Sequence, residues 1–331
     1  MSIEKKIIER AKKLNRTIVL PEAKYSTRVL TAGVKAAKLG IAKIIFVVSN
    51  SEGEANHKQY ENKNLVVINQ KTYINNKIMI KTLLEKRRAK GMTEEEAKRL
   101  VETDSIIFGT MLVECGFADG MVAGAETTSA DVLRPALQII KAKKDVSVVS
   151  SAFIMSGKTI PNEHGCYLFA DCALNLDPTP EELADIACAT AASAREICGF
   201  EPIVALLSYI TFGGAKTDKE SDKICQTRRI LKERNVDFVF DGQMQVDAAL
   251  NPTVAEKKAP HSKVAGKANC LIFPNIMAGN IGYKLFQAGG AGKINAVGPF
   301  TQGLNKPIND LSRGCTVDEI IISIALTALQ S

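Results

Sequence analysis

Strand-like apolar runs alternate with helical patterns along the first part of the chain. The strand-like runs cover residues 17–20, 44–48, 65–68 and 120–124. The helical spacing of apolar residues covers 2–15, 26–39, 77–88 and 93–117. Strands that alternate with helices form a mainly parallel sheet with helices on both faces. We therefore predict a doubly wound α/β/α fold.

A length of 331 residues suggests two domains rather than one core. The charged stretch 141–145 is the first candidate boundary. Beyond it the pattern resumes, with strands predicted at 146–155, 202–208, 238–240 and 271–273 and helices at 177–198 and 217–234. The second half is thus predicted to be another α/β domain.

Composition excludes several classes of function. The net charge is +7, but there is no Trp and no Arg-rich tract, which disfavours nucleic acid and favours a small polyanionic substrate. Eight cysteines without a Cys-x-x-Cys pair indicate reduced thiols in the cytoplasm. Three scattered histidines predict neither a metal nor a histidine base. No signal peptide or membrane-length apolar run is found, so we expect no membrane association.

The stretch 298–315 is the predicted active-site segment. Its three glycines and two prolines argue against a regular helix or a central strand, so we expect a loop. Thr316 and Glu319 form a predicted capping box, which places Ser312 and Arg313 just before a helix N-terminus. A hydroxyl, a guanidinium and free N–H groups suit a phosphate or an oxyanion. A tight turn with a solvent-facing Arg is an equal alternative.

Two further segments place polar groups between a strand and a helix. After the strand at 120–124, Thr128, Ser129 and Arg134 could surround a phosphate, or the hydroxyls could be an ordinary N-cap. Gly279 to Lys284 reads as a Gly/Asn loop at a helix start. The run 289–293 is not a P-loop, because Gln287 and Ile294 stand where Gly and Ser or Thr are required.

Together several stretches resemble the phosphate acetyltransferase (phosphotransacetylase) family over nearly the whole length. They are 90–93, 128–138, 169–173, 240–243, 266–269, 279–284 and 298–315. The family interconverts acetyl phosphate plus coenzyme A with acetyl-CoA plus phosphate. The resemblance implies two α/β domains with the active site in the cleft between them, the first domain at 1–145 plus 302–331 and the second at 146–301. It also implies a homodimer and no cofactor, coenzyme A being a substrate.

Site residues follow from the resemblance position by position. Arg313 resembles the arginine that binds the phosphoryl group and polarises the acetyl carbonyl, and Ser312 the hydroxyl that assists the intermediate. The remaining substrate-binding positions are Thr128, Ser129, Asn280, Tyr283, Lys284, Arg134 and Arg87. The implied mechanism is direct thiolate attack on acetyl phosphate in a ternary complex, without an acyl-enzyme.

The sequence departs from the family pattern at two places. The carboxylate that matches the proposed thiol base is Glu319, which the capping box also explains, and Asp318 is the alternative base. Near residue 288 the family commonly has an arginine, but this chain has Ala288. Lys293 is the candidate replacement, although an ammonium cannot grip a phosphate bidentately.

Different functions stay open at this point. A propionyl or butyryl phosphate could replace acetyl phosphate, since the sequence does not reveal the depth of the acyl pocket. A silent sensor of acetyl phosphate or acetyl-CoA and a hydroxy-acid dehydrogenase of similar architecture are further candidates. Cys315, beside Arg313 near a helix N-terminus, is a less favoured nucleophile.

Overall fold

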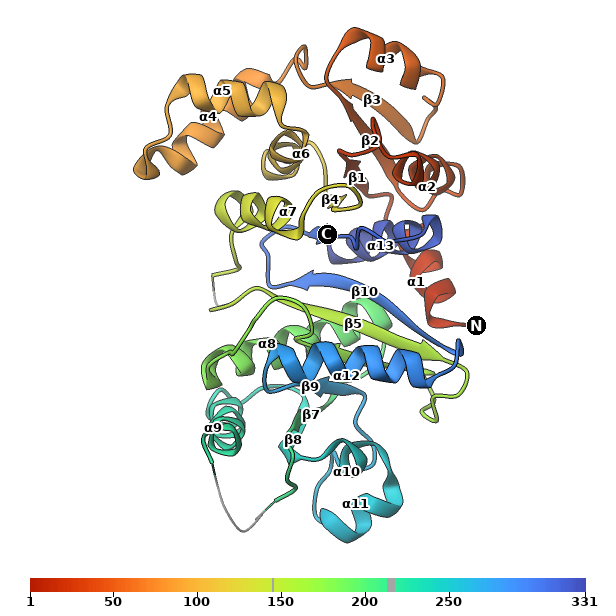
Figure 1. Ribbon diagram of the computed structural model, residues 1–331, viewed down its shortest axis with the longest axis vertical. Helices are drawn as coiled ribbons and strands as arrows, with labels where there is room; N and C mark the ends of the chain where they lie inside the picture. The colour runs from red at the N-terminus through yellow and green to blue at the C-terminus, as the bar shows by residue number, and fades with distance from the viewer. Residues whose placement is uncertain (145, 213–217) are drawn as a thin grey trace. The chain divides into compact units, whose positions relative to one another are not determined.

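The computed structural model describes residues 1–144, 146–212 and 218–331, which form two compact units (Figure 1). The N-terminal unit comprises Glu4–Lys143 and Leu304–Ser331. The middle unit comprises Lys144–Gly303 with Met1–Ile3. Each unit contains a largely parallel sheet with helices, so the predicted α/β fold class is confirmed.

The N-terminal unit is built on a five-stranded parallel sheet. The strand order is β11-β4-β1-β2-β3, and neighbouring strands pair in parallel throughout. The strands are β1 (Thr17–Leu20), β2 (Lys43–Val48), β3 (Leu65–Asn69), β4 (Gly120–Ala123) and β11 (Ile308–Asp310). Since β4 and most of β1 and β2 are buried, they read as continuous apolar runs rather than as alternating patterns.

Helices of this unit largely follow the predicted ranges, with two corrections. They are α1 (Ile3–Ala11), α2 (Thr27–Lys38), α3 (Ser51–Lys58), α4 (Asn76–Arg87), α5 (Glu94–Thr103), α6 (Ser105–Glu114), α7 (Ser129–Pro135) and α13 (Val317–Gln330). The single helix predicted at 93–117 is wrong, because Asp104 is extended and caps a new helix by accepting from the N–H groups of Ile106 and Ile107. Helix α3 was missed because it buries no residue and has no apolar face.

The middle unit has a six-stranded mixed sheet with the order β10-β5-β6-β9-β7-β8. Its strands are β5 (Ser150–Gly157), β6 (Cys166–Ala170), β7 (Ile203–Leu207), β8 (Val239–Met244), β9 (Cys270–Ile272) and β10 (Ile294–Gln302). β10, β5 and β6 pair antiparallel, and the other pairs are parallel. Its α-helices are α8 (Pro180–Ser193), α9 (Lys219–Glu233), α10 (Val246–Leu250), α11 (Pro252–Lys258) and α12 (Ile276–Gly289).

The extent of helix α12 shows that another prediction was wrong. The segment Gly279 to Lys284, expected as a loop before a helix, lies inside α12, whose N-cap is Asn275. Gly279 is needed there because a Cβ would collide with the carbonyl oxygen of Asp171. The glycine therefore serves close packing of the helix rather than a loop.

The stretch 298–315 is not one loop, as the sequence analysis expected. Its first part completes β10, whose pairing with β5 is irregular between Val297 and Phe300, and its middle forms β11. Both are edge strands, where glycine and proline are tolerated. Only the residues after Asp310 form the expected connection into α13.

Candidate functional site

Three chain segments meet at the carboxyl edge of the N-terminal sheet. β11, β4 and β1 are neighbours and run parallel, so the segments that follow them leave from the same edge. These segments begin at Pro21, Gly124 and Leu311. In open parallel sheets this edge is where ligands bind.

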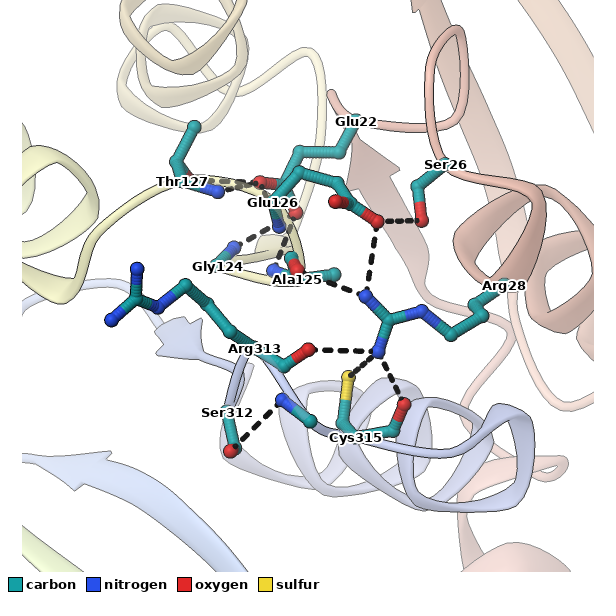
Figure 2. A network of polar contacts seen from close by, with 11 residues as sticks. Glu22, Ser26, Arg28, Gly124, Ala125, Glu126, Thr127, Ser312, Arg313 and Cys315 are labelled. Atoms are coloured by element: carbon teal, nitrogen blue, oxygen red, sulfur yellow. Dashed lines mark hydrogen bonds and ion pairs between the residues drawn. The ribbon is translucent and has the colours of Figure 1, made fainter.

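Glu22 holds the segment after β4 in place. Its side chain is fully buried, and its carboxylate accepts hydrogen bonds from the backbone N–H groups of 124–127 at 2.8 to 3.1 Å. The Thr127 hydroxyl also donates to it, at 2.8 Å. Figure 2 shows the loop wrapped around this carboxylate. Because both oxygens of this buried carboxylate accept hydrogen bonds from successive backbone N–H groups, Glu22 fixes the conformation of the loop.

Arg28 joins that loop to the predicted active-site segment. One guanidinium nitrogen donates to the backbone oxygens of Arg313 and Cys315, at 3.0 and 2.6 Å. The other donates to the Ala125 oxygen and to Glu126 Oε1, both at 3.0 Å. Arg28 is therefore the bridge between the segments after β4 and β11 (Figure 2).

Ser312 and Arg313 are exposed, as a ligand-binding role requires. The Arg313 side chain extends away from the Arg28 network, while its backbone oxygen is held by Arg28 (Figure 2). The Ser312 hydroxyl accepts from the Gly314 N–H at 3.3 Å. The backbone of this turn is thus fixed and its side chains are free to meet a ligand.

The first turn of α13 contains both candidate bases. The capping box is confirmed: Glu319 Oε2 accepts from the Thr316 N–H and hydroxyl at 2.7 and 2.9 Å, and Thr316 Oγ1 accepts from the Glu319 N–H. Asp318 is exposed in the same turn. Glu319 therefore caps the helix through Oε2, and its role as base stays a prediction.

Cys315 is buried beside these residues. Burial raises the pKa of its thiol above the ordinary value, and the nearby Arg28 charge opposes this shift only in part. A thiol that resists ionisation is a poor nucleophile. The structure therefore speaks against Cys315 as an acyl carrier.

Thr128 and Ser129 lie at the start of α7. Thr128 is the N-cap: its hydroxyl accepts from the Asp131 N–H at 3.3 Å and donates to Asp131 Oδ2 at 2.7 Å. Ser129 and Arg134 are exposed. The N-cap prediction is confirmed, whereas phosphate binding by Thr128, Ser129 and Arg134 stays a prediction.

Asp310 is a site residue that the sequence analysis did not single out. It ends β11, is 8% exposed and packs against Gly124, where a Cβ would collide with Asp310 Oδ1. Oδ1 has no hydrogen-bond partner among the described residues. Burial, with the Glu22 charge, raises the pKa of Asp310 to about 6 despite a hydrogen bond from the Ser129 hydroxyl.

The remaining predicted residues lie elsewhere. Arg87 is half-buried at the end of α4. In the middle unit, Tyr283 stacks on Phe153 with ring centroids 4.2 Å apart, and the Lys284 ammonium lies 5.0 Å from the Tyr283 ring. The Asn280 amide donates to the Cys172 oxygen at 3.0 Å, which is a structural contact.

Lys293, the proposed substitute for the family arginine, is exposed in the turn after α12. Its backbone N–H donates to the Gly290 oxygen at 2.8 Å. Its side chain is therefore accessible to an anion.

Glu22, Arg28 and Asp310 were missed because none stands in a motif with a known chemical signature. The signal available was their position, because Glu22 follows the predicted strand 17–20 and Asp310 ends the edge strand β11.

In the part of the chain that the structure describes, no group of three or more His, Cys, Asp or Glu side chains is arranged to hold a metal ion. Within the same residues, no helix has the length and apolar character needed to cross a bilayer.

Comparisons with known proteins agree with the resemblance drawn from the motifs. A family model described as "Phosphate acetyl/butaryl transferase" matches residues 2–328. A phosphate acetyltransferase of Thermoanaerobacterium thermosaccharolyticum is 44% identical over 335 residues, 100% of both chains, and one of Bacillus subtilis is 41% identical over 95% of this chain and 94% of its own. A phosphotransacetylase structure from Streptococcus pyogenes has a TM-score of 0.91 and 38% identity, over 100% of this chain and 99% of that one.

Proposed function

Because the chain belongs to the phosphate acetyl/butaryl transferase family, we propose that it is a phosphate acetyltransferase, which interconverts acetyl phosphate plus coenzyme A with acetyl-CoA plus phosphate. The full-length similarity to proteins of that name carries the proposal. The exposed Ser312 and Arg313 before a capped helix support it, since they supply a hydroxyl and a guanidinium for an anionic substrate.

In this reaction the thiolate of coenzyme A attacks the acetyl carbonyl of acetyl phosphate within a ternary complex. The new C–S bond forms as the C–O bond to phosphate breaks, and the electron pair leaves with the phosphate oxygen. Arg313 stabilises the oxyanion and the leaving phosphate, while Ser312 binds the same intermediate. Binding both substrates together supplies a large part of the rate by proximity, so neither an acyl-enzyme nor a cofactor is required.

We assign the acyl phosphate to Thr128, Ser129, Tyr283 and Lys284. Arg134 and Arg87 would be further basic substrate-binding residues, and Lys293 would neutralise charge on coenzyme A. Glu319, or Asp318 beside it, is the base that the family resemblance proposes for the thiol.

The test is the initial rate of thioester formation from coenzyme A with acetyl, propionyl and butyryl phosphate in a buffer without metal. Acetyl phosphate should give the highest kcat/KM, and Arg313→Ala should reduce it by about 100-fold or more. A higher kcat/KM for butyryl phosphate would assign the chain to the butyryl branch of its family. If no acyl phosphate reacts, the proposal fails and the sensor of acetyl phosphate or acetyl-CoA becomes the favoured function.

We also propose that the enzyme is a homodimer. Met277, Ile281 and Leu285 follow one another at helical spacing on α12 and are 70%, 55% and 66% exposed. A row of large apolar side chains in water favours burial against a partner.

The free cysteines among the described residues support a reducing, cytoplasmic compartment.

A further inference from the structure

A cavity of about 330 Å³ lies between helix α9 and strand β8 of the middle unit, and the proposed function does not use it. The two elements pack against each other, and β8 is an edge strand of its sheet (Figure 1). The cavity is lined by Cys225, Arg228, Arg229, Lys232 and Phe240. Its volume is that of a small-molecule site, and three of the five lining side chains are cations. The composition of the wall therefore suits an anion.

The cations of this cavity stand on one face of α9. Its four lining residues from the helix follow one another at positions i, i+3, i+4 and i+7. No carboxylate of the described residues lines the cavity with them. Like charges three and four residues apart on a helix repel each other, and Lys232 stands in that relation to both arginines. A bound anion would relieve this repulsion.

The guanidinium of Arg228 is held in one direction. Its Nε forms an ion pair with Asp241 Oδ1 at 2.8 Å, and the Ser262 hydroxyl donates to Asp241 Oδ2 at 2.6 Å. The guanidinium also lies over the Phe212 ring, 5.7 Å from its centroid. Within the described residues, the two terminal nitrogens of Arg228 have no hydrogen-bond partner. A guanidinium held through Nε can offer both terminal nitrogens to one phosphoryl group.

Arg229 and Lys232 have little competition for their charges. Nε of Arg229 lies 3.7 Å from Glu233 Oε1, and the two side chains are 70% and 67% exposed. A long and solvated pair of this kind contributes little. Lys232 is exposed and has no ion-pair partner in the part of the chain that the structure describes. Both cations are therefore available to the anion that Arg228 binds.

Phe240 supplies the aromatic part of the wall. It is half-buried on β8, and its ring packs edge-on against Phe238 with the ring centroids 6.0 Å apart. An aromatic ring beside cations suits a ligand that has both a planar ring and a phosphoryl group. The wall thus selects more than charge.

We propose that this cavity binds a phosphorylated compound with a planar ring, of the class of the nucleoside monophosphates. The phosphoryl group binds to Arg228, Arg229 and Lys232, and the ring lies against Phe240. None of these residues is among those proposed for acetyl transfer, so the inference goes beyond the proposed function and does not depend on it.

Cys225 is a chemical reporter of the cavity. It is an exposed, free cysteine in the cavity wall, and its sulfur accepts from Gln243 Nε2 at 3.3 Å. The experiment measures how fast iodoacetamide alkylates Cys225 in the full-length protein, by peptide mass spectrometry, as adenosine 5′-monophosphate is added. The rate should fall by about 10-fold when the nucleotide is at roughly ten times its Kd. Alkylation of Cys188, which is partly buried on α8 of the same unit, should not change.

Two further probes separate the phosphoryl group from the ring. Inorganic phosphate should protect Cys225 more weakly than the nucleotide, and adenosine, which has no phosphoryl group, should not protect it. Phe240→Leu should remove the advantage of the nucleotide over phosphate, because the ring contact is lost. Equal protection by phosphate and nucleotide in the unmodified protein would overturn the role of Phe240. Protection by adenosine would overturn the anion site.

Lys232→Ala tests the cations. Because Lys232 is exposed, its loss should leave the fold intact, and the Kd of the nucleotide should rise by about 10-fold as one charge-assisted contact is lost. Lys257→Ala is the matched control, since it removes the same charge from an exposed position on α11 of the same unit and should leave the Kd unchanged. An unchanged Kd in Lys232→Ala, or an equal rise in both variants, would overturn the site.

Arg313→Ala distinguishes this cavity from the proposed transfer site. If the nucleotide protected Cys225 by binding at the transfer site, this variant would lose the protection, whereas the cavity predicts that protection persists. Protection in a protein that forms no thioester would contradict the proposed function alone. An active enzyme in which the nucleotide leaves alkylation of Cys225 unchanged would overturn the cavity alone.

Discussion

Two buried carboxyl groups at one sheet edge have opposite surroundings. Glu22 is matched by N–H donors, whereas Asp310 is left with an unpaired oxygen beside another negative charge. Burying a polar group costs free energy unless its hydrogen bonds are satisfied. We expect the first residue to stabilise the fold and the second to reduce its stability.

Asp310→Asn should therefore stabilise the protein at neutral pH. The folded-state pKa lies above the unfolded one, so the native state binds more protons between about pH 4 and 6, and stability falls as pH rises through that window. Removing the charge should raise the free energy of unfolding at pH 7 by about 3 kcal/mol and have little effect at pH 4. Urea unfolding at both pH values measures this, and equal effects at the two would contradict it.

Glu22→Gln should do the reverse. The new amide would point N–H donors at the donors of 124–127, leaving buried groups unsatisfied, so unfolding should become easier by about 3 kcal/mol. Glu126→Gln is the matched control, because its contacts with Ser26 and Arg28 are partly solvated. A loss in the control as large as in Glu22→Gln would argue against the buried anchor.

At the scale of elements, the start of α13 fixes where Arg313 stands. Thr316→Ala removes the hydroxyl that accepts from the Glu319 N–H and should cost about 1 kcal/mol, whereas Thr316→Ser should keep the cap. We also expect a raised KM for acetyl phosphate in the alanine variant, since the turn before the helix loosens. Thermal unfolding and initial rates check both effects, and identical behaviour of the two variants would contradict them.

Elements with strong local signals were predictable from the sequence. The buried strands β1 and β2 and the capping box before α13 depend on neighbouring residues, and they agree with the structure. The break at Asp104 and the continuation of α12 through Gly279 were not predictable, because a cap and a close packing contact decided them. Ser312 and Arg313 belong to a local sequence motif and could be named from it. Arg28 and Asp310 could not be named, because their place in the site depends on the order of the strands in the sheet.

At the scale of the whole molecule, the exposed row on α12 is expected to be the dimer contact. Ile281→Lys places a charge in the middle of that row and should yield monomers, as measured by sedimentation velocity. Ile74→Lys is the control, because Ile74 is 88% exposed but lies in the N-terminal unit. A monomeric unmodified protein, or dimers that persist in Ile281→Lys, would contradict this assignment.

The central claim is direct acetyl transfer between acetyl phosphate and coenzyme A in a ternary complex. It is tested most directly by initial rates of thioester formation over a grid of both substrate concentrations. The account predicts intersecting lines in double-reciprocal plots, and the same pattern in Cys315→Ala. Parallel lines, which indicate an acyl-enzyme, or the absence of any thioester would contradict it.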